Sequence, residues 1–298
     1  VLAGLGMAAL LERIRSERVA ALIGTCVLAI ILFEYWVAPF PMSPPDTPAY
    51  YDEVALNGES DGAVLNLPMN YDRPGYLLYQ TVHSVPLTVA YISRDDPRTL
   101  TERAPVLQHF RHLGPDILDV DPVLVGMTVL SDLDVDKVVL DRYKMPGGLE
   151  REYTTELASA IFAGIAPEYE NDRLTAYRVQ PLEAPEPYLV LGELNWGPLV
   201  GDEAEGIPLA RQLLGEKVKL YVRHPPAKAQ LRLRYRTETG APLTVELPGE
   251  TVLLPASASA TETNLDLNMA NQTDTIEIIL RPYAPGRAWV ESVGLVLP

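Results

Sequence analysis

The longest uninterrupted apolar pattern lies near the start of the chain. Residues 19–38 read VAALIGTCVLAIILFEYWVA and contain one charged side chain, Glu34. At a rise of about 1.5 Å per residue, a helix of this length spans about 30 Å, which is the thickness of a bilayer's hydrocarbon core. Tyr35 and Trp36 follow Glu34, and aromatic residues of this kind favour the membrane–water interface. The pattern predicts a membrane-spanning helix over residues 19–38.

The flanks of this run predict its orientation. Three arginines precede it, whereas residues 39–48 (PFPMSPPDTP) contain no base. The positive-inside rule therefore places the residues after about 40 on the extracytoplasmic side of a cell membrane. A cleaved signal peptide and a buried soluble helix are the alternatives, but no small-x-small cleavage site follows the run. Residues 1–11 are also apolar and look like the end of an earlier helix. We expect residues 1–40 to form a membrane segment.

Residues 41–184 switch repeatedly between strand and helix patterns. Short apolar runs predict strands over residues 63–67, 89–93, 135–141, 168–169 and 174–179. Helical spacing and first-turn prolines predict helices over residues 105–113, 121–130 and 150–164. Alternating strands and helices indicate an extracytoplasmic α/β domain with a mostly parallel sheet.

Residues 185–298 have an all-β pattern. Leu231, Leu233 and Tyr235 alternate with three arginines, as expected for a strand with one buried face. Predicted strands cover residues 188–191, 218–223, 230–236, 243–247, 251–254, 264–268, 275–280 and 290–296. Their number and spacing predict an antiparallel, jelly-roll-like β-sandwich. The fold class expected for the whole chain is therefore α+β multidomain, with an N-terminal transmembrane helix.

Composition excludes several classes of function. The 298 residues include 24 Lys and Arg against 40 Asp and Glu, a net charge of −16, which argues against a nucleic-acid partner. The single cysteine, Cys26, excludes a disulfide framework, a CxxC site and a multi-thiolate zinc site. The chain also lacks a P-loop, a GxGxxG, an HExxH and a nucleophile elbow, so we expect no cofactor.

Two of the four histidines are spaced so that they could share a metal ion. His109 and His112 lie three residues apart on a predicted helix, which places both on one face. Further ligands would have to come from His83, Asp116, Asp119 and Asp121. Because most such pairs are surface or packing histidines, we expect no metal site.

Two groups of residues are candidates for substrate binding. Gln80, His83 and Arg94 lie at the ends of two predicted elements, where open sheets tend to bind ligands. The alternative, which the residues favour, is that they only hold a loop in place. In the sandwich, Trp196 could stack on a sugar ring, followed as candidates by Trp289 and Tyr283, although tryptophans are more often buried.

The order of several motifs resembles a known class of membrane protein. VLNLPM (64–69), YLLYQTVHSVPL (76–87), AYISRDDPRT (90–99), VLSDLDVDKVVLDRYK (129–144) and YENDRLTAYRV (169–179) follow the predicted span and a proline-rich exit. Together they resemble the C-terminal extracytoplasmic region of bacterial polytopic membrane proteins similar to GT-C-type glycosyltransferases. The resemblance covers about residues 1–200 and assigns no catalytic residue, because the acid of GT-C enzymes lies in an early loop that has no counterpart here.

The resemblance implies a function for the parent protein and leaves this chain's own role open. It implies a membrane-embedded, glycosyltransferase-like protein acting on lipid-linked sugars, of which these residues form a C-terminal fragment without the catalytic acid. The expected partners are a lipid bilayer and a lipid-linked sugar or cell-surface glycan. The alternatives are a non-catalytic extracytoplasmic module that binds carbohydrate and a purely structural surface protein. Whether the chain is an enzyme stays open.

Overall fold

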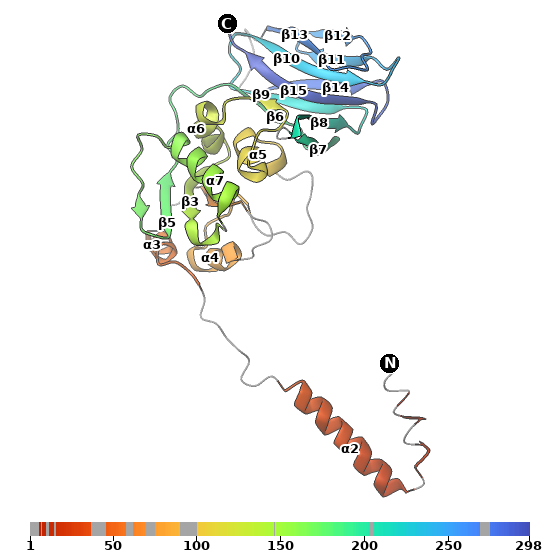
Figure 1. Ribbon diagram of the computed structural model, residues 1–298. Helices are drawn as coiled ribbons and strands as arrows, with labels where there is room; N and C mark the ends of the chain where they lie inside the picture. The colour runs from red at the N-terminus through yellow and green to blue at the C-terminus, as the bar shows by residue number, and fades with distance from the viewer. Residues whose placement is uncertain are drawn as a thin grey trace. The chain divides into compact units, whose positions relative to one another are not determined.

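A computed structural model describes most of the chain. The described residues are 6, 8–9, 12–14, 16–36, 46–57, 62–69, 75–89, 100–145, 147–202, 205–268 and 275–298. The chain divides into two compact units, Val1–Asp46 and Thr47–Pro298. The strands of the described residues all belong to the larger unit (Figure 1).

The first unit contains the helix α2 (Glu17–Glu34), which covers most of the predicted membrane span. It is 18 residues long and has charged side chains at both ends: Glu17, Arg18 and Glu34. Among the described residues, no helix has both the length and the apolar character needed to cross a membrane. The predicted span over residues 19–38 is therefore not supported, and its last two positions lie outside the described residues.

The α/β part of the second unit is built on a four-stranded sheet in the order β1-β3-β5-β4. The strands are β1 (Ala63–Leu67), β3 (Val135–Asp141), β4 (Tyr169–Glu170) and β5 (Leu174–Arg178). The helices are α3 (Tyr50–Asn57), α4 (Gly75–His83), α5 (Pro105–His112), α6 (Pro122–Asp132) and α7 (Gly148–Ile161), with the 3₁₀ turns η1 (Leu100–Glu102) and η2 (Arg142–Lys144). The sequence prediction missed α3 and α4, and the predicted strand at 89–93 lies mostly outside the described residues.

The expectation of a mostly parallel sheet is wrong. Among the described strands of this sheet, β1 and β3 pair in parallel, whereas β5 pairs antiparallel with both β3 and β4. The cause is the three-residue connection between β4 and β5, which forces the chain to reverse direction. As a result, β5 is inserted between β3 and β4, and the parallel arrangement ends at β3.

Each face of this sheet is covered by a separate hydrophobic core. Leu65 and Leu67 of β1 face the core shared with α5, α6 and α7, while Val64 faces the core shared with α3 and α4. This follows from the alternation of side chains along a strand. Asp121 caps α6 by accepting a hydrogen bond from the Val123 N–H at 2.9 Å, as the Asp-Pro sequence predicts. Figure 1 shows α5 and α6 between this sheet and the strands of the sandwich.

The C-terminal part is a two-sheet antiparallel β-sandwich, as predicted. One sheet has the order β13-β10-β15-β8-β7 and the other β12-β11-β14-β9-β6. The strands are β6 (Tyr188–Leu191), β7 (Trp196–Asp202), β8 (Ile207–Leu213), β9 (Val218–Arg223), β10 (Lys228–Thr237), β11 (Leu243–Leu247), β12 (Glu250–Leu254), β13 (Thr261–Asn268), β14 (Thr275–Pro282) and β15 (Ala288–Val296). β7 and β8 are absent from the prediction because their sequences lack clean apolar alternation.

The α/β part also supplies a strand to the sandwich. The strand β2 (Leu118–Asp119) pairs in parallel with Val293 and Gly294 of β15. Ile117 and Leu118 are fully or almost fully buried in the sandwich core. Gly294 permits this approach, because a Cβ there would lie 2.8 Å from the Asp119 carbonyl oxygen.

Candidate functional site

A groove runs along the sandwich where β6 and β9 meet the helical layer. It consists of three adjoining hollows of about 350, 300 and 210 Å³, and Glu193 lines all three. We call them the large, middle and small hollows. The large hollow lies between Arg103 and Asp132 of the α/β part and Tyr221 and Arg223 of β9. Tyr221 also lines the middle hollow, so its ring connects the two.

Trp196 lines the small hollow, at the start of β7. Its indole N–H donates to the Lys219 carbonyl oxygen at 3.0 Å, and its ring packs partly against the sandwich core. Asn195 precedes it with a φ of 72°, and its side-chain amide donates to the Lys217 carbonyl oxygen at 2.8 Å. These bonds fix the loop between β6 and β7, so the groove wall is held in place before any ligand binds.

Charged side chains surround the aromatic rings of the groove. Arg103 donates from Nε to the Leu191 carbonyl oxygen at 3.1 Å and from Nη1 to Glu193 at 3.3 Å. Lys219, which lines the middle hollow, donates to Glu277 at 2.6 Å. The groove therefore presents aromatic surface together with hydrogen-bonding groups of both signs, the combination typical of sites for polar organic ligands.

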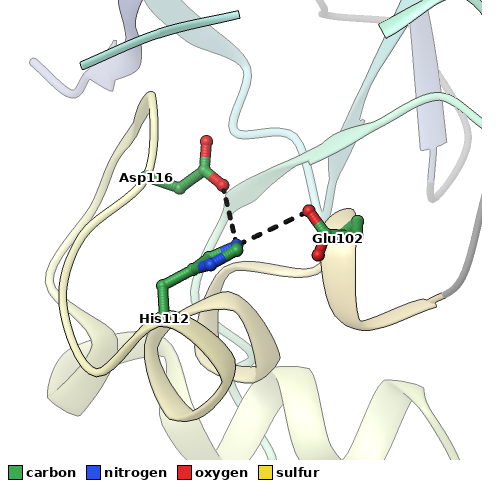
Figure 2. A group of neighbouring side chains, drawn as sticks. All are labelled: Glu102, His112 and Asp116. Carbon is green, nitrogen blue, oxygen red and sulfur yellow. Dashed lines mark ion pairs between the residues drawn. The ribbon is translucent and has the colours of Figure 1, made fainter. Parts of the chain in front are cut away.

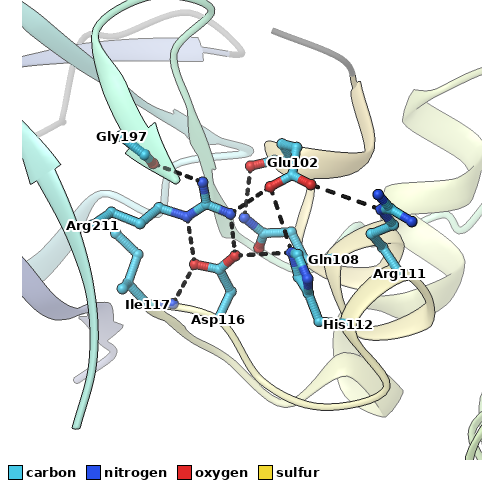
Figure 3. A network of polar contacts seen from close by, with 8 residues as sticks. All are labelled: Glu102, Gln108, Arg111, His112, Asp116, Ile117, Gly197 and Arg211. Atoms are coloured by element: carbon cyan, nitrogen blue, oxygen red, sulfur yellow. Dashed lines mark hydrogen bonds and ion pairs between the residues drawn. The ribbon is translucent and has the colours of Figure 1, made fainter. Parts of the chain in front are cut away.

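A buried ion network joins the helical layer to β8 (Figure 3), and two of its members, Glu102 and Arg211, line the small hollow. Arg211 donates from Nε to Asp116 Oδ1 at 2.8 Å and from Nη2 to Asp116 Oδ2 at 2.6 Å. The same Nη2 donates to Glu102 Oε2 at 2.7 Å, and Nη1 donates to the Gly197 carbonyl oxygen at 3.0 Å. The side chains of Asp116 and Arg211 are 1% and 3% exposed, so solvent screens this pair weakly.

The one group of possible metal ligands among the described residues belongs to this network. Glu102, His112 and Asp116 bring their ligand atoms within 4.8 Å of one another, and His112 Nε2 lies 3.5 Å from each carboxylate (Figure 2). Burial raises the pKa of Glu102, but hydrogen bonds to His112 and Arg211 outweigh it and lower the pKa to about 2. Because Arg211 already neutralises these carboxylates, the arrangement fits a structural ion network better than a metal centre.

A second polar cluster borders the large hollow. Asp132, at the end of α6, accepts a hydrogen bond from the Tyr188 hydroxyl at 2.8 Å and contacts His224 Nε2 at 2.7 Å. Burial and the bond to Asp132 raise the pKa of Tyr188, which keeps the phenol protonated. Arg223 Nε lies 3.5 Å from the same carboxylate, and Arg223 Nη1 donates to Thr275 Oγ1 at 3.0 Å.

The predicted polar site at Gln80, His83 and Arg94 is only partly described. Gln80 Nε2 donates to the Val85 carbonyl oxygen at 3.2 Å, and His83 Nδ1 accepts from the Val85 N–H at 3.0 Å. Both side chains therefore hold the loop after α4, which is the structural alternative considered above. Arg94 lies outside the described residues.

His83 also belongs to a buried cluster between the sheet and the helices α3 and α4. The Tyr51 hydroxyl donates to Asn66 Oδ1 at 2.6 Å, and the Tyr51 ring stacks on His83 with centroids 5.3 Å apart. Burial lowers the pKa of His83, which favours the neutral ring. Within the described part of the chain, Asn66 Nδ2 and His83 Nε2 are buried without a hydrogen-bond partner.

The other predicted residues are spread over the molecule. Trp289 on β15 lies under the Arg236 guanidinium, 4.5 Å from the ring centroid, and does not line any of the three hollows. Trp196 and Trp289 therefore do not form one site. His109 contacts the Tyr153 hydroxyl at 2.7 Å instead of joining His112, and burial lowers its pKa to about 4.

Sequence reasoning missed most of the groove. Tyr221 and Arg223 alternate with buried valine and leucine along β9, which shows that they face away from the core. That alternation could have selected them as surface candidates, but it could not show what they face. Arg103 and Asp132 lie about a hundred residues earlier, and no local pattern links them to β9.

No protein-family model and no curated protein matches the chain. Solved carbohydrate-binding modules are similar to part of it. A module from Cellvibrio mixtus lichenase 5A, solved with cellotriose, is 14% identical, with a TM-score of 0.26 over 35% of this chain and 88% of the module. The C-terminal module of a laminarinase from Zobellia galactanivorans is 10% identical, with a TM-score of 0.27 over 38% of this chain and 100% of the module. At these TM-scores, the similarity carries no argument about what this chain binds.

Proposed function

We propose that the chain is a non-catalytic carbohydrate-binding protein that holds a glycan in the groove centred on Glu193. The observation that supports this proposal is the set of three adjoining hollows lined by Trp196, Tyr221 and polar side chains. A pyranose ring has apolar C–H faces and a rim of hydroxyl groups, so it needs aromatic surface and hydrogen-bonding groups side by side. The groove offers both on a wall that hydrogen bonds fix in place.

The proposal is tested with a pair of tyrosine variants of the full chain on a glycan array, followed by calorimetry on the glycans that bind. Tyr221→Ala removes the ring shared by the large and middle hollows, and we expect it to weaken binding about tenfold or more. Tyr283→Ala is the matched control, because Tyr283 is 70% exposed and lies on a turn outside the groove. Equal binding by both variants, or an array without any bound glycan, would contradict the proposal.

The wider expectations about the parent protein stay predictions. Neither the fold nor the matched proteins bear on the resemblance to GT-C-type glycosyltransferases, on lipid-linked sugar as a substrate, or on an extracytoplasmic location. A reporter enzyme fused to the carboxyl terminus in cells tests the location. Activity on the cytoplasmic side alone would contradict it.

A further inference from the structure

We propose that the large hollow of the groove binds the carboxylate of an acidic sugar, so that the preferred ligand is a uronate-containing glycan. This inference rests on the proposed function and adds the chemical class of the ligand. It is based on two arginines, Arg103 and Arg223, that both line one hollow of about 350 Å³. Arg103 comes from the loop after η1 and Arg223 from the end of β9.

The carboxylate nearest to Arg223 is already engaged. Asp132 accepts from the Tyr188 hydroxyl at 2.8 Å and contacts His224 Nε2 at 2.7 Å. Arg223 Nε lies 3.5 Å from Asp132, farther than an ordinary N–H···O hydrogen bond, and is buried without a hydrogen-bond partner in the described structure. Arg223 Nη1 donates to Thr275, and the guanidinium also interacts with the Tyr188 hydroxyl, so these contacts engage only part of its five N–H groups. Arg223 therefore keeps N–H groups for a further acceptor.

Arg103 can also donate to a ligand carboxylate. Its Nε bond to the Leu191 carbonyl oxygen orients the guanidinium, and its partner Glu193 is 70% exposed. An ion pair with so exposed a partner is weak, because water screens it and competes for both groups. A ligand carboxylate held inside the hollow would be screened less and could displace Glu193 from Arg103.

A carboxylate fits these two arginines better than a neutral hydroxyl does. A guanidinium presents paired N–H donors that match the two oxygens of a carboxylate, and such charge-assisted bonds are stronger than neutral ones. The surrounding rings of Tyr188 and Tyr221 would contact the body of the sugar. The chain has a net charge of −16, so the protein as a whole repels anions. A preference for an anionic ligand therefore has to arise from the two arginines of this hollow.

The experiment compares each uronate oligosaccharide with its carboxyl-reduced counterpart, which differs only in –COO⁻ against –CH₂OH. Oligogalacturonate and an alginate oligosaccharide are titrated into the full chain by calorimetry, each beside its reduced form. We expect at least one acidic form to bind about tenfold or more tightly than its reduced partner. Arg223→Gln should weaken binding of the acidic form more than binding of the reduced form, so that the ratio of the two dissociation constants falls toward one. Arg287→Gln is the matched control, since this exposed arginine does not line any of the hollows.

The outcomes separate this inference from the proposed function. Equal binding of acidic and reduced forms overturns the inference and leaves glycan binding intact. Binding of neutral array glycans without binding of any uronate also overturns the inference and leaves glycan binding intact. The absence of any glycan ligand overturns both. If Arg223→Gln fails to fold, Arg103→Gln and Arg223→Lys take its place, and retention of the full acidic preference in both variants counts against the inference.

Discussion

The buried guanidinium of Arg211 allows a quantitative test of how the helical layer is fixed to the sandwich. Arg211→Met keeps most of the side-chain volume but removes four hydrogen bonds, three of them to carboxylates. Asp116 is then left buried with the Ile117 N–H and His112 as its partners. Removing one partner of a buried ion pair costs about 3–5 kcal/mol, because the remaining charge is desolvated and uncompensated. For a chain of this size, that corresponds to a fall in Tm of about 10 °C.

Urea unfolding of the full chain, followed by circular dichroism, measures this loss. Asp116→Asn and the double variant Arg211→Met/Asp116→Asn complete a double-mutant cycle, in which we expect the double variant to lose about 1–3 kcal/mol less than the sum of the single losses. Arg287→Met is the control, because its ion pair with Glu238 is half exposed and should contribute under about 1 kcal/mol. A loss under about 1 kcal/mol for Arg211→Met, or additivity in the cycle, would refute the reasoning.

Three further outcomes are expected. The pKa of His109 is about 4 in the folded protein, against 6.5 for an exposed histidine. As the pH drops from 6.5 to 4, the unfolded chain therefore binds the proton before the folded protein does, and the free energy of unfolding falls by about 3 kcal/mol. Melting scans of His109→Asn across that range should show a flatter pH dependence, and an unchanged slope would contradict the assignment. Asp121→Ala removes the cap of α6 and should lower the free energy of unfolding by about 1 kcal/mol in urea titrations, with no change counting against the cap. A high-resolution crystal structure should show ordered water on Asn66 Nδ2 and His83 Nε2, whereas empty density around both buried donors would be at odds with their hydrogen-bonding needs.

Local sequence patterns predicted the elements whose burial alternates or repeats regularly. The alternation in β10 is the clearest case, because each of its arginines lies between two buried residues. Asp121 and Pro122 marked the start of α6 for the same local reason. β7 could not be found in this way, since Gly197, Pro198 and Gly201 interrupt its pattern.

Long-range geometry was the part that no local pattern could supply. β5 lies between β3 and β4 because the short connection after β4 reverses the direction of the chain. The sequence of that connection does not show which strands β5 pairs with. Likewise, Asp116 and Arg211 meet although 95 positions separate them in the sequence. The groove depends on the same kind of contact, so aromatic candidates such as Trp196 could be proposed from sequence, whereas their polar neighbours could not.

The strand β2, which the α/β part supplies to the sandwich, limits how this chain can be cut or recombined. Because Ile117 and Leu118 complete the sandwich core and β2 completes its sheet, the sandwich is not a self-contained cassette. A fragment starting at residue 185 would leave the β15 backbone beside β2 unpaired and would uncover apolar surface, a combination that promotes association between chains. Transplanting the sandwich to another host therefore requires residues 117–119 to travel with it.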